Sequence, residues 1–143
     1  MTSARIDLPE PMPFATEASV RIQDVNYGGH LGNDALVSLL HEARLRCLAE
    51  HGLSERDCGG AGLILTELEV VYRAEAFHGD LLRIEVAVTD LRGGSASFRY
   101  RVQRPADGRE IARARTGMAF LDYDSRRVRR MPRAFATAFS AGD

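Results

Sequence analysis

The chain has 143 residues, 45% of them hydrophobic and 27% charged, and its formal net charge at pH 7 is −1. This length fits one domain with its own hydrophobic core, and the composition is that of an ordinary globular protein. The balanced charge gives no sign of a nucleic-acid-binding surface, and no apolar run approaches the roughly 20 residues that cross a bilayer. We therefore expect neither nucleic acid nor membrane as a partner.

The first residues differ in composition from the rest of the chain. Residues 1–13 are polar, with prolines spaced from Pro9 to Pro13, and they predict a flexible arm ahead of one domain over residues 14–143. This arm lacks the basic start and the apolar stretch of an export signal, so we expect a cytoplasmic protein. Cys47 and Cys58 have no spacing typical of a zinc site or a disulfide framework, and we interpret both as structural.

The first predicted elements are a strand and a long helix. Apolar and polar residues alternate over residues 15–23, as in a half-buried strand, and turn-forming residues follow at 24–30. A helix is expected next, capped by Asn33 or Asp34 and ended by Gly52. Its apolar residues occupy more than one side, which indicates that a sheet wraps around it. These residues are Leu36, Val37, Leu39, Leu40, Ala43, Leu45, Cys47 and Leu48.

Four strands are predicted after the helix, over residues 63–73, 81–91, 95–104 and 110–123. The connections between the last three are short enough for antiparallel neighbours, with a turn at Gly93-Gly94. The order strand, helix and four strands predicts an α+β fold, in which one antiparallel sheet curls around one long central helix. The arginines between 126 and 133 are interpreted as a solvated run of charge.

The residues suited to chemistry gather where the first strand passes into the helix. The stretch from Asp24 to Arg44 reads D-V-N-Y-G-G-H-L-G-N-D-A-L-V-S-L-L-H-E-A-R. It brings carboxylates, amides and an imidazole to one junction, and its glycines allow a ligand to approach the backbone closely. The free N–H groups and the positive dipole end of a helix N-terminus suit a developing oxyanion. These are the parts that an acyl-transfer site needs.

This stretch resembles the 4-hydroxybenzoyl-CoA thioesterase-like branch of the hotdog superfamily. The matching motifs are Asp24-Val25-Asn26, Gly29-His30-Leu31-Gly32-Asn33, Glu42-Ala43-Arg44, Val71-Tyr72-Arg73 and Gly79-Asp80. The resemblance spans residues 20–123. It implies a single hotdog domain that hydrolyses the thioester of an acyl-CoA or an acyl carrier protein. It also implies a homodimer or homotetramer with sites between protomers, and CoA as part of the substrate, with no metal or other cofactor.

The sequence departs from the family pattern where the catalytic carboxylate is expected. The family's usual catalytic carboxylate matches Asn26, and an amide neither accepts a proton at neutral pH nor attacks as an anion. The catalytic candidates are therefore Asn26 and His30, which would orient substrate and water, and Asp34, Asp24 or Glu42 as the base. The resemblance places substrate contacts at Tyr27, Gly28, Gly29, Leu31, Gly32, Asn33 and, on the next strand, Glu67.

Each candidate base also has a purely structural interpretation. Asp34 could cap the helix, Asp24 could bind loop amides, and Glu42 could pair with Arg46 four residues later. Two other functions also stay open. One is a hotdog enoyl-CoA hydratase or dehydratase, and the other is a non-catalytic acyl-CoA-binding protein, which the amide at Asn26 suggests.

Overall fold

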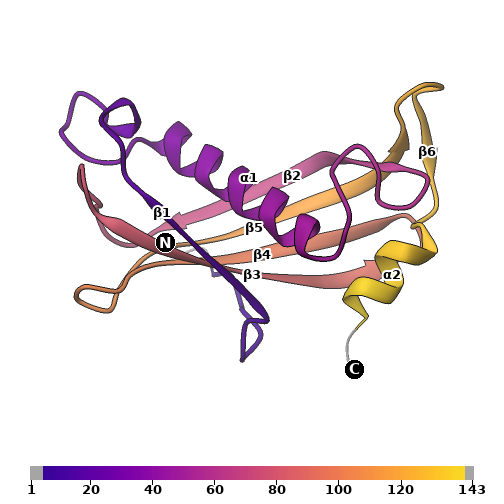
Figure 1. Ribbon diagram of the computed structural model, residues 1–143. Helices are drawn as coiled ribbons and strands as arrows, with labels where there is room; N and C mark the ends of the chain where they lie inside the picture. The colour runs from indigo at the N-terminus through magenta and orange to yellow at the C-terminus, as the bar shows by residue number, and fades with distance from the viewer. Residues whose placement is uncertain (1–4, 141–143) are drawn as a thin grey trace.

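One antiparallel sheet curls around one long helix (Figure 1). The computed structural model describes residues 5–140, and the sheet order is β1-β3-β4-β5-β2, with a short β6 beside β5. The elements are β1 (Phe14–Ser19), the 3-10 turn η1 (Ile22–Asp24), α1 (Asn33–Glu50), β2 (Gly62–Tyr72), β3 (Leu81–Arg92), β4 (Ser95–Arg104), β5 (Arg109–Asp122), β6 (Arg127–Arg129) and α2 (Arg133–Phe139). The predicted α+β fold is confirmed.

The enclosed helix accounts for most of the core. Leu36, Leu40 and Leu48 of α1 are fully buried, and they face the concave side of the sheet, where Phe98 and Tyr100 are also fully buried. Each such large side chain contributes about 1.5–3 kcal/mol when it leaves water. The apolar residues that the sequence places on several sides of the helix therefore have a sheet to pack against.

The first strand ends earlier than the alternation of apolar residues predicts. β1 stops at Ser19, and the next residues form the 3-10 turn η1 instead of continuing to residue 23. The carboxylate of Asp24 accepts the backbone N–H of Arg21 at 2.9 Å, and the N–H of Val20 donates to Asp80 outside the strand. These local bonds turn the chain away from the sheet and towards the start of α1.

The helix also begins differently from the prediction. Its N-cap residue is Gly32, in an extended conformation, and neither Asn33 nor Asp34 caps the helix through its side chain. The N–H of Gly32 donates to the backbone oxygen of Asp24 at 2.9 Å, which fixes the residue just before the helix in this extended form. The capping role predicted for Asn33 or Asp34 is therefore wrong, and both side chains belong to the first helical turn.

The C-terminal residues form two elements that the sequence did not predict. β6 extends the sheet beside β5, and α2 closes the end of the core near the last turn of α1 (Figure 1). Phe135 of α2 is fully buried, with its ring centroid 5.0 Å from that of Phe120 and 6.3 Å from that of Phe98. The helix is only seven residues long and lies in an arginine-rich stretch, so its apolar face is a weak sequence signal.

Residues 5–13 of the expected arm lie against the outer face of the sheet, and residues 1–4 lie outside the described residues (Figure 1). Ile6 is 3% exposed there, and its backbone oxygen accepts a hydrogen bond from Arg113 at 3.2 Å. Arg99 donates to the backbone oxygen of Asp7 at 3.0 Å. The arm therefore covers part of the face opposite to α1.

We expect Gly62→Ala to lower the free energy of unfolding by about 1–3 kcal/mol, the usual cost of overpacking. A Cβ at Gly62 would lie 2.5 Å from the ring of Tyr123 and 2.7 Å from the backbone oxygen of Glu55. Gly93→Ala is the matched control, because nothing lies within 4 Å of a Cβ at that position. Chemical denaturation of the two variants measures the difference, and equal midpoints would contradict the predicted close packing.

Candidate active site

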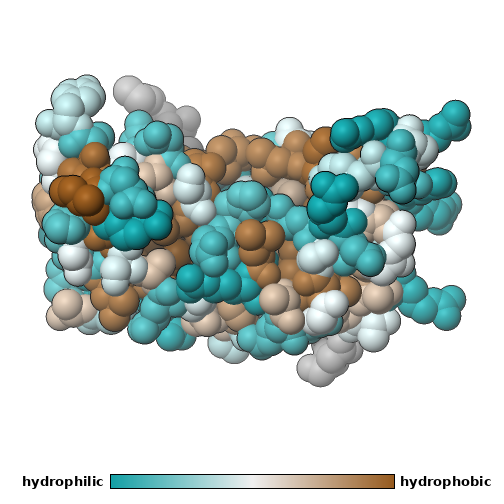
Figure 2. All heavy atoms as spheres, turned by 45° about the horizontal axis from the view of Figure 1, so that its top comes forward, coloured by the Kyte–Doolittle hydropathy of each residue, from teal (hydrophilic) through white to brown (hydrophobic). Residues whose placement is uncertain are grey.

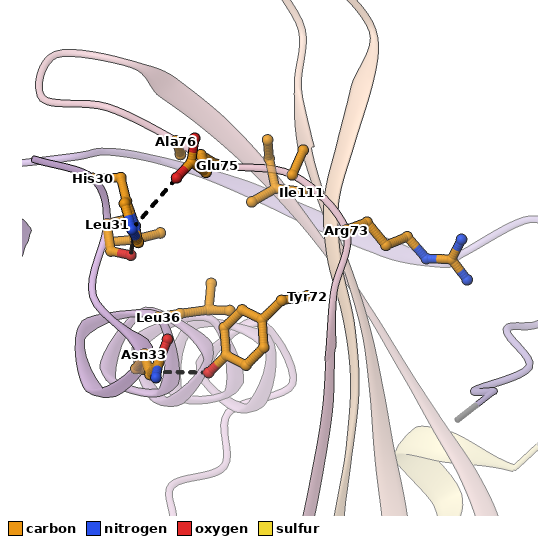
Figure 3. Close-up of a pocket in the computed structure, with 10 residues that line it drawn as sticks. His30, Leu31, Asn33, Leu36, Tyr72, Arg73, Glu75, Ala76 and Ile111 are labelled. Carbon is orange, nitrogen blue, oxygen red and sulfur yellow. Dashed lines mark hydrogen bonds and ion pairs between the residues drawn. The ribbon is translucent and has the colours of Figure 1, made fainter. Parts of the chain in front are cut away.

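A cavity of about 280 Å³ lies between the loop before α1, the first turn of α1 and the end of β2. Figure 3 shows His30 and Glu75 facing each other on one side of it, and Tyr72 reaching towards Asn33 on the other. Its remaining lining comes from Leu31, Leu36, Arg73, Ala74, Ala76 and Ile111. Three of the site residues predicted from the sequence motifs, His30, Leu31 and Asn33, therefore meet at one cavity.

The loop before α1 uses most of its own amide groups to hold its shape. The N–H of Gly29 donates to Asn26 at 3.0 Å, and that of Gly32 donates to Asp24 at 2.9 Å. The N–H of Leu31 donates to Ala76 at 2.8 Å and ties the loop to the segment after β2. These three amides cannot also bind a carbonyl oxygen, so within residues 29–32 only the N–H of His30 has no hydrogen-bond partner among the described residues.

Free backbone N–H donors lie next in the chain, in the first turn of α1. Within residues 5–140, no hydrogen bond is found for the N–H groups of Asn33, Asp34 and Ala35. The positive end of the helix dipole adds to their attraction for negative charge. This end of α1 borders the cavity, which Asn33 helps to line. The helix start therefore offers an oxyanion more free donors than the glycine loop does.

His30 has one ring nitrogen bound to the backbone and the other beside a carboxylate. Its Nδ1 lies 3.1 Å from the backbone oxygen of Leu31, and its Nε2 lies 3.5 Å from Glu75. A carbonyl oxygen only accepts, so Nδ1 carries the hydrogen, and Nε2 of the neutral ring has a free lone pair. The ring can accept a proton at Nε2, and Glu75 stabilises the charge that results.

Sequence reasoning missed Glu75 because it belongs to no motif and lies in the connection between β2 and β3. Only its position two residues after the motif residue Arg73 could have drawn attention to it.

Asn26 lies next to His30 in the loop. Its Oδ1 accepts the N–H of Gly28 at 2.9 Å, which leaves the Nδ2 hydrogens of the amide to donate elsewhere. A Cβ at Gly28 would lie 3.3 Å from both Asn26 Oδ1 and His30 Nε2, so the two polar groups flank this glycine closely. Asn26 can therefore orient a ligand or a water near His30, but it supplies no base.

Asp34 and Tyr72 face each other near the helix start. Burial and the neighbouring Asp34 carboxylate raise the pKa of Tyr72, so its hydroxyl stays a hydrogen-bond donor. This hydroxyl donates to the backbone oxygen of Asn33 at 3.2 Å. Asp34 itself is exposed and is not among the residues that line the cavity. It stays a candidate base at the edge of the site.

The other predicted site residues lie further away. Glu42 pairs with Arg46 at 2.8 Å, as its structural interpretation predicted, and Glu67 lies on the outer face of β2, where it pairs with Arg115 at 2.9 Å. Tyr27 is fully exposed at the tip of the loop. None of these three side chains lines the cavity.

Asp24 is the only buried carboxylate among the candidates, at 6% exposure. Burial raises the pKa of this carboxyl. Hydrogen bonds from the backbone and guanidinium of Arg21 together lower the pKa by more, so the net pKa lies below its usual value. Its oxygens accept the backbone N–H at 2.9 Å and the Nε–H at 3.3 Å. Asp24 is thus an anion that holds the turn before α1, outside the cavity lining.

Residues 20–139 match the family model of the thioesterase-like superfamily, and the chain belongs to this superfamily. Among solved structures it resembles Slr0204, a 1,4-dihydroxy-2-naphthoyl-CoA thioesterase from Synechocystis, with a TM-score of 0.82 and 22% identity over 91% of this chain and 97% of that one. A thioesterase-superfamily structure from Jannaschia sp. CCS1 has a TM-score of 0.82 and 21% identity, over 93% and 84%.

BH1999, a gentisyl-coenzyme A thioesterase, has a TM-score of 0.79 and 18% identity over 89% of this chain and 100% of that one. A comparison with curated proteins found no match. Identities this low show the fold, and the fold is the hotdog fold that the sequence motifs predicted. Thioester hydrolysis is the general activity of the superfamily to which the chain belongs.

We expect Asp24→Asn to lower the free energy of unfolding by about 1–2 kcal/mol near pH 7, because charge-assisted hydrogen bonds are lost. The pKa of Asp24 is lower in the folded chain than in the unfolded one. Its stabilising contribution is therefore present above its ordinary pKa and is lost as the pH falls below about 4.

Denaturation curves from pH 7 to pH 3 should show the difference from the wild type shrinking as the pH falls. Asp124→Asn, at an exposed position in the turn after β5, is the control and should match the wild type throughout. A constant difference across this range would count against the ionic role of Asp24.

Proposed function

We propose that this protein hydrolyses the thioester of an acyl-CoA or an acyl carrier protein to a free acid and a thiol. One observation carries the proposal: the His30–Glu75 pair and the free N–H groups of the helix start border the same cavity. A base and an oxyanion-binding group at one site are what acyl transfer to water needs.

In the proposed reaction, His30 Nε2 takes a proton from a water molecule while the water oxygen attacks the thioester carbon. The N–H groups of Asn33 and its neighbours bind the oxyanion of the tetrahedral intermediate. The carbon–sulfur bond then breaks, and the proton on His30 passes to the leaving sulfur. Glu75, 3.5 Å from Nε2, stabilises the imidazolium between these two transfers. The products are a carboxylic acid and a thiol, and no metal or further cofactor takes part.

The structural relatives support a CoA thioester as the substrate class, because two of them are named as thioesterases of aromatic acyl-CoAs. CoA thioesters are made and used in the cytoplasm, where we place this activity. Both cysteines are free and buried, which fits a reducing compartment.

We expect the wild type to release thiol from at least one member of a panel of short, long and aromatic acyl-CoAs. His30→Gln should lower kcat by about 100-fold or more, because it removes the base but keeps a polar side chain. Glu75→Gln should cost about tenfold, because only the stabilisation of the imidazolium is lost. Asp34→Asn tests the other candidate base and should leave kcat within about threefold of the wild type.

The same panel separates the alternatives. A loss of turnover in Asp34→Asn but not in His30→Gln would move the base to the helix start. Hydration of enoyl-CoA without thiol release would identify a hydratase. Saturable binding of acyl-CoA without either reaction would identify a binding protein and overturn the proposed hydrolysis.

We also propose a homodimer joined through β2, which could pair further into a homotetramer. β2 is a sheet edge that bonds only to β5 among the described strands. Its exposed apolar side chains are Ile64, Leu65, Leu68 and Tyr72. In Figure 2 a band of apolar surface follows the upper edge of the molecule, the side on which β2 lies in Figure 1. An apolar, unpaired edge strand is a ready template for a second copy.

Leu68→Asp should shift the protein from dimer to monomer, because a carboxylate would be buried without a partner in the joint. Light scattering coupled to size-exclusion chromatography measures the mass. The matched control is Val128→Asp on β6, where the valine is 73% exposed and lies away from β2. The proposed β2 interface would be contradicted if the wild type has the mass of a monomer. It would also be contradicted if Leu68→Asp keeps the mass of a dimer.

A further inference from the structure

A second cavity, of about 340 Å³, runs along the open side of α1 facing β2. Its walls are largely apolar and include Val37 and Leu40 of the helix and Leu65, Leu68 and Met118 of the sheet. It lies further along α1 than the cavity at His30, on the same side of the helix. We call it the α1–β2 groove. Polar groups that are almost completely buried line part of this otherwise apolar groove.

Arg44 is one of these groups, and it is 7% exposed. Its Nε donates to Glu55, and its Nη1 donates to the hydroxyl of Tyr100 at 3.1 Å. Burial alone would lower the pKa of this guanidinium, but Tyr100 and Glu55 together hold it above its ordinary value, so Arg44 stays charged.

The Nη2 group of Arg44 makes no hydrogen bond within the described part of the chain. Every fully enclosed side-chain nitrogen or oxygen in that part does have a partner. It follows that Nη2 is open to the groove that Arg44 lines, with its hydrogens free to donate.

Thr116 supplies a second free donor. Its hydroxyl lies 2.7 Å from that of Tyr100, which is fully buried and already accepts from Arg44. The hydroxyl hydrogen of Tyr100 has no other acceptor among the described residues, so Tyr100 donates to Thr116. The hydroxyl hydrogen of Thr116 is then left over, and Thr116 lines the groove. Two buried side chains therefore present unused donors to one apolar groove.

We propose that Arg44 and Thr116 bind an oxygen near the far end of the substrate's acyl group, and that they select an oxygen-bearing acyl chain over a plain hydrocarbon chain. This rests on the proposed thioesterase function. A bound hydrocarbon would displace water from both donors and offer them no partner, whereas a hydroxyl or carbonyl oxygen would accept from both.

The acyl group, rather than the pantetheine arm, fits this position because the donors are 93% and 98% buried. The pantetheine arm has to leave the protein to reach its nucleotide, whereas the acyl end of the substrate can stop beside these two buried side chains. Arg44 is eleven residues after Asn33, roughly 16 Å along the helix, and its side chain leans back by about 6 Å. The oxygen should therefore lie about 10 Å from the thioester carbon, as in 8-hydroxyoctanoyl-CoA.

The test compares matched pairs of CoA thioesters that differ only in a terminal hydroxyl, from butanoyl to dodecanoyl. We expect kcat/KM of the wild type to favour 8-hydroxyoctanoyl-CoA over octanoyl-CoA by about tenfold or more. The preference should be absent for 4-hydroxybutanoyl-CoA, which is too short to reach. Thr116→Val, which keeps the side-chain shape, should lower the preference at least about threefold. The wild-type pairs decide the question even if this variant does not fold.

Equal kcat/KM for both members of every pair would overturn the inference while leaving the proposed hydrolysis intact. An equal loss of kcat/KM for both members of a pair in Thr116→Val would also overturn the inference, because Thr116 would then contact the pantetheine arm that both members share. If no thioester is hydrolysed, calorimetric binding of the thioethers S-octyl-CoA and S-(8-hydroxyoctyl)-CoA separates the two proposals. A tenfold preference for the hydroxylated thioether would support the groove although hydrolysis had failed, and equal binding would overturn both.

Discussion

The enclosure of α1 by a sheet that is not wide enough to surround it is the constraint on which the rest of the molecule depends. The helix buries leucines on several sides, and it lies closest to β1 and β3. The opposite side of the helix faces β2, where the packing is open and both cavities lie. The same asymmetry leaves apolar side chains of β2 uncovered. The packing of α1 against β1 and β3 thus leaves open both the two cavities and the surface that we propose for the dimer.

The start of α1 holds most of the free backbone donors near the cavity because the preceding loop uses most of its own N–H groups internally. Its amides close the turn and bind the segment after β2, so the helix N-terminus holds the free donors. Asn26 stands where the family pattern has a carboxylate, and it acts here as part of the turn. In the proposed hydrolysis the imidazole of His30 takes the proton instead, and the carboxylate of Glu75 stabilises the imidazolium.

The buried Arg44 gives the helix motif Glu42-Ala43-Arg44 a physical meaning. Glu42 points towards solvent and pairs with Arg46, while Arg44 points into the molecule and joins α1 to β4 and β5 through Tyr100 and Thr116. Breaking such a network is costly because a buried charge would lose its partners. This polar network holds the helix in place and leaves donors that face the groove, where we propose that the acyl group binds.

The sequence by itself determined the α+β fold, the long helix and the strands β1 to β5, although not β6 and α2, because hydrophobic periodicity and short turns are local properties of the chain. It also located His30 and Asn33 at the junction that became the cavity. Tertiary structure decided the rest: that the helix begins after Gly32 without a side-chain cap, that Asp24 supports the turn, and that Glu75 lies opposite His30. These outcomes depend on which segments pack together across the sheet, and distances between residues far apart in the chain leave no local pattern for a sequence to display.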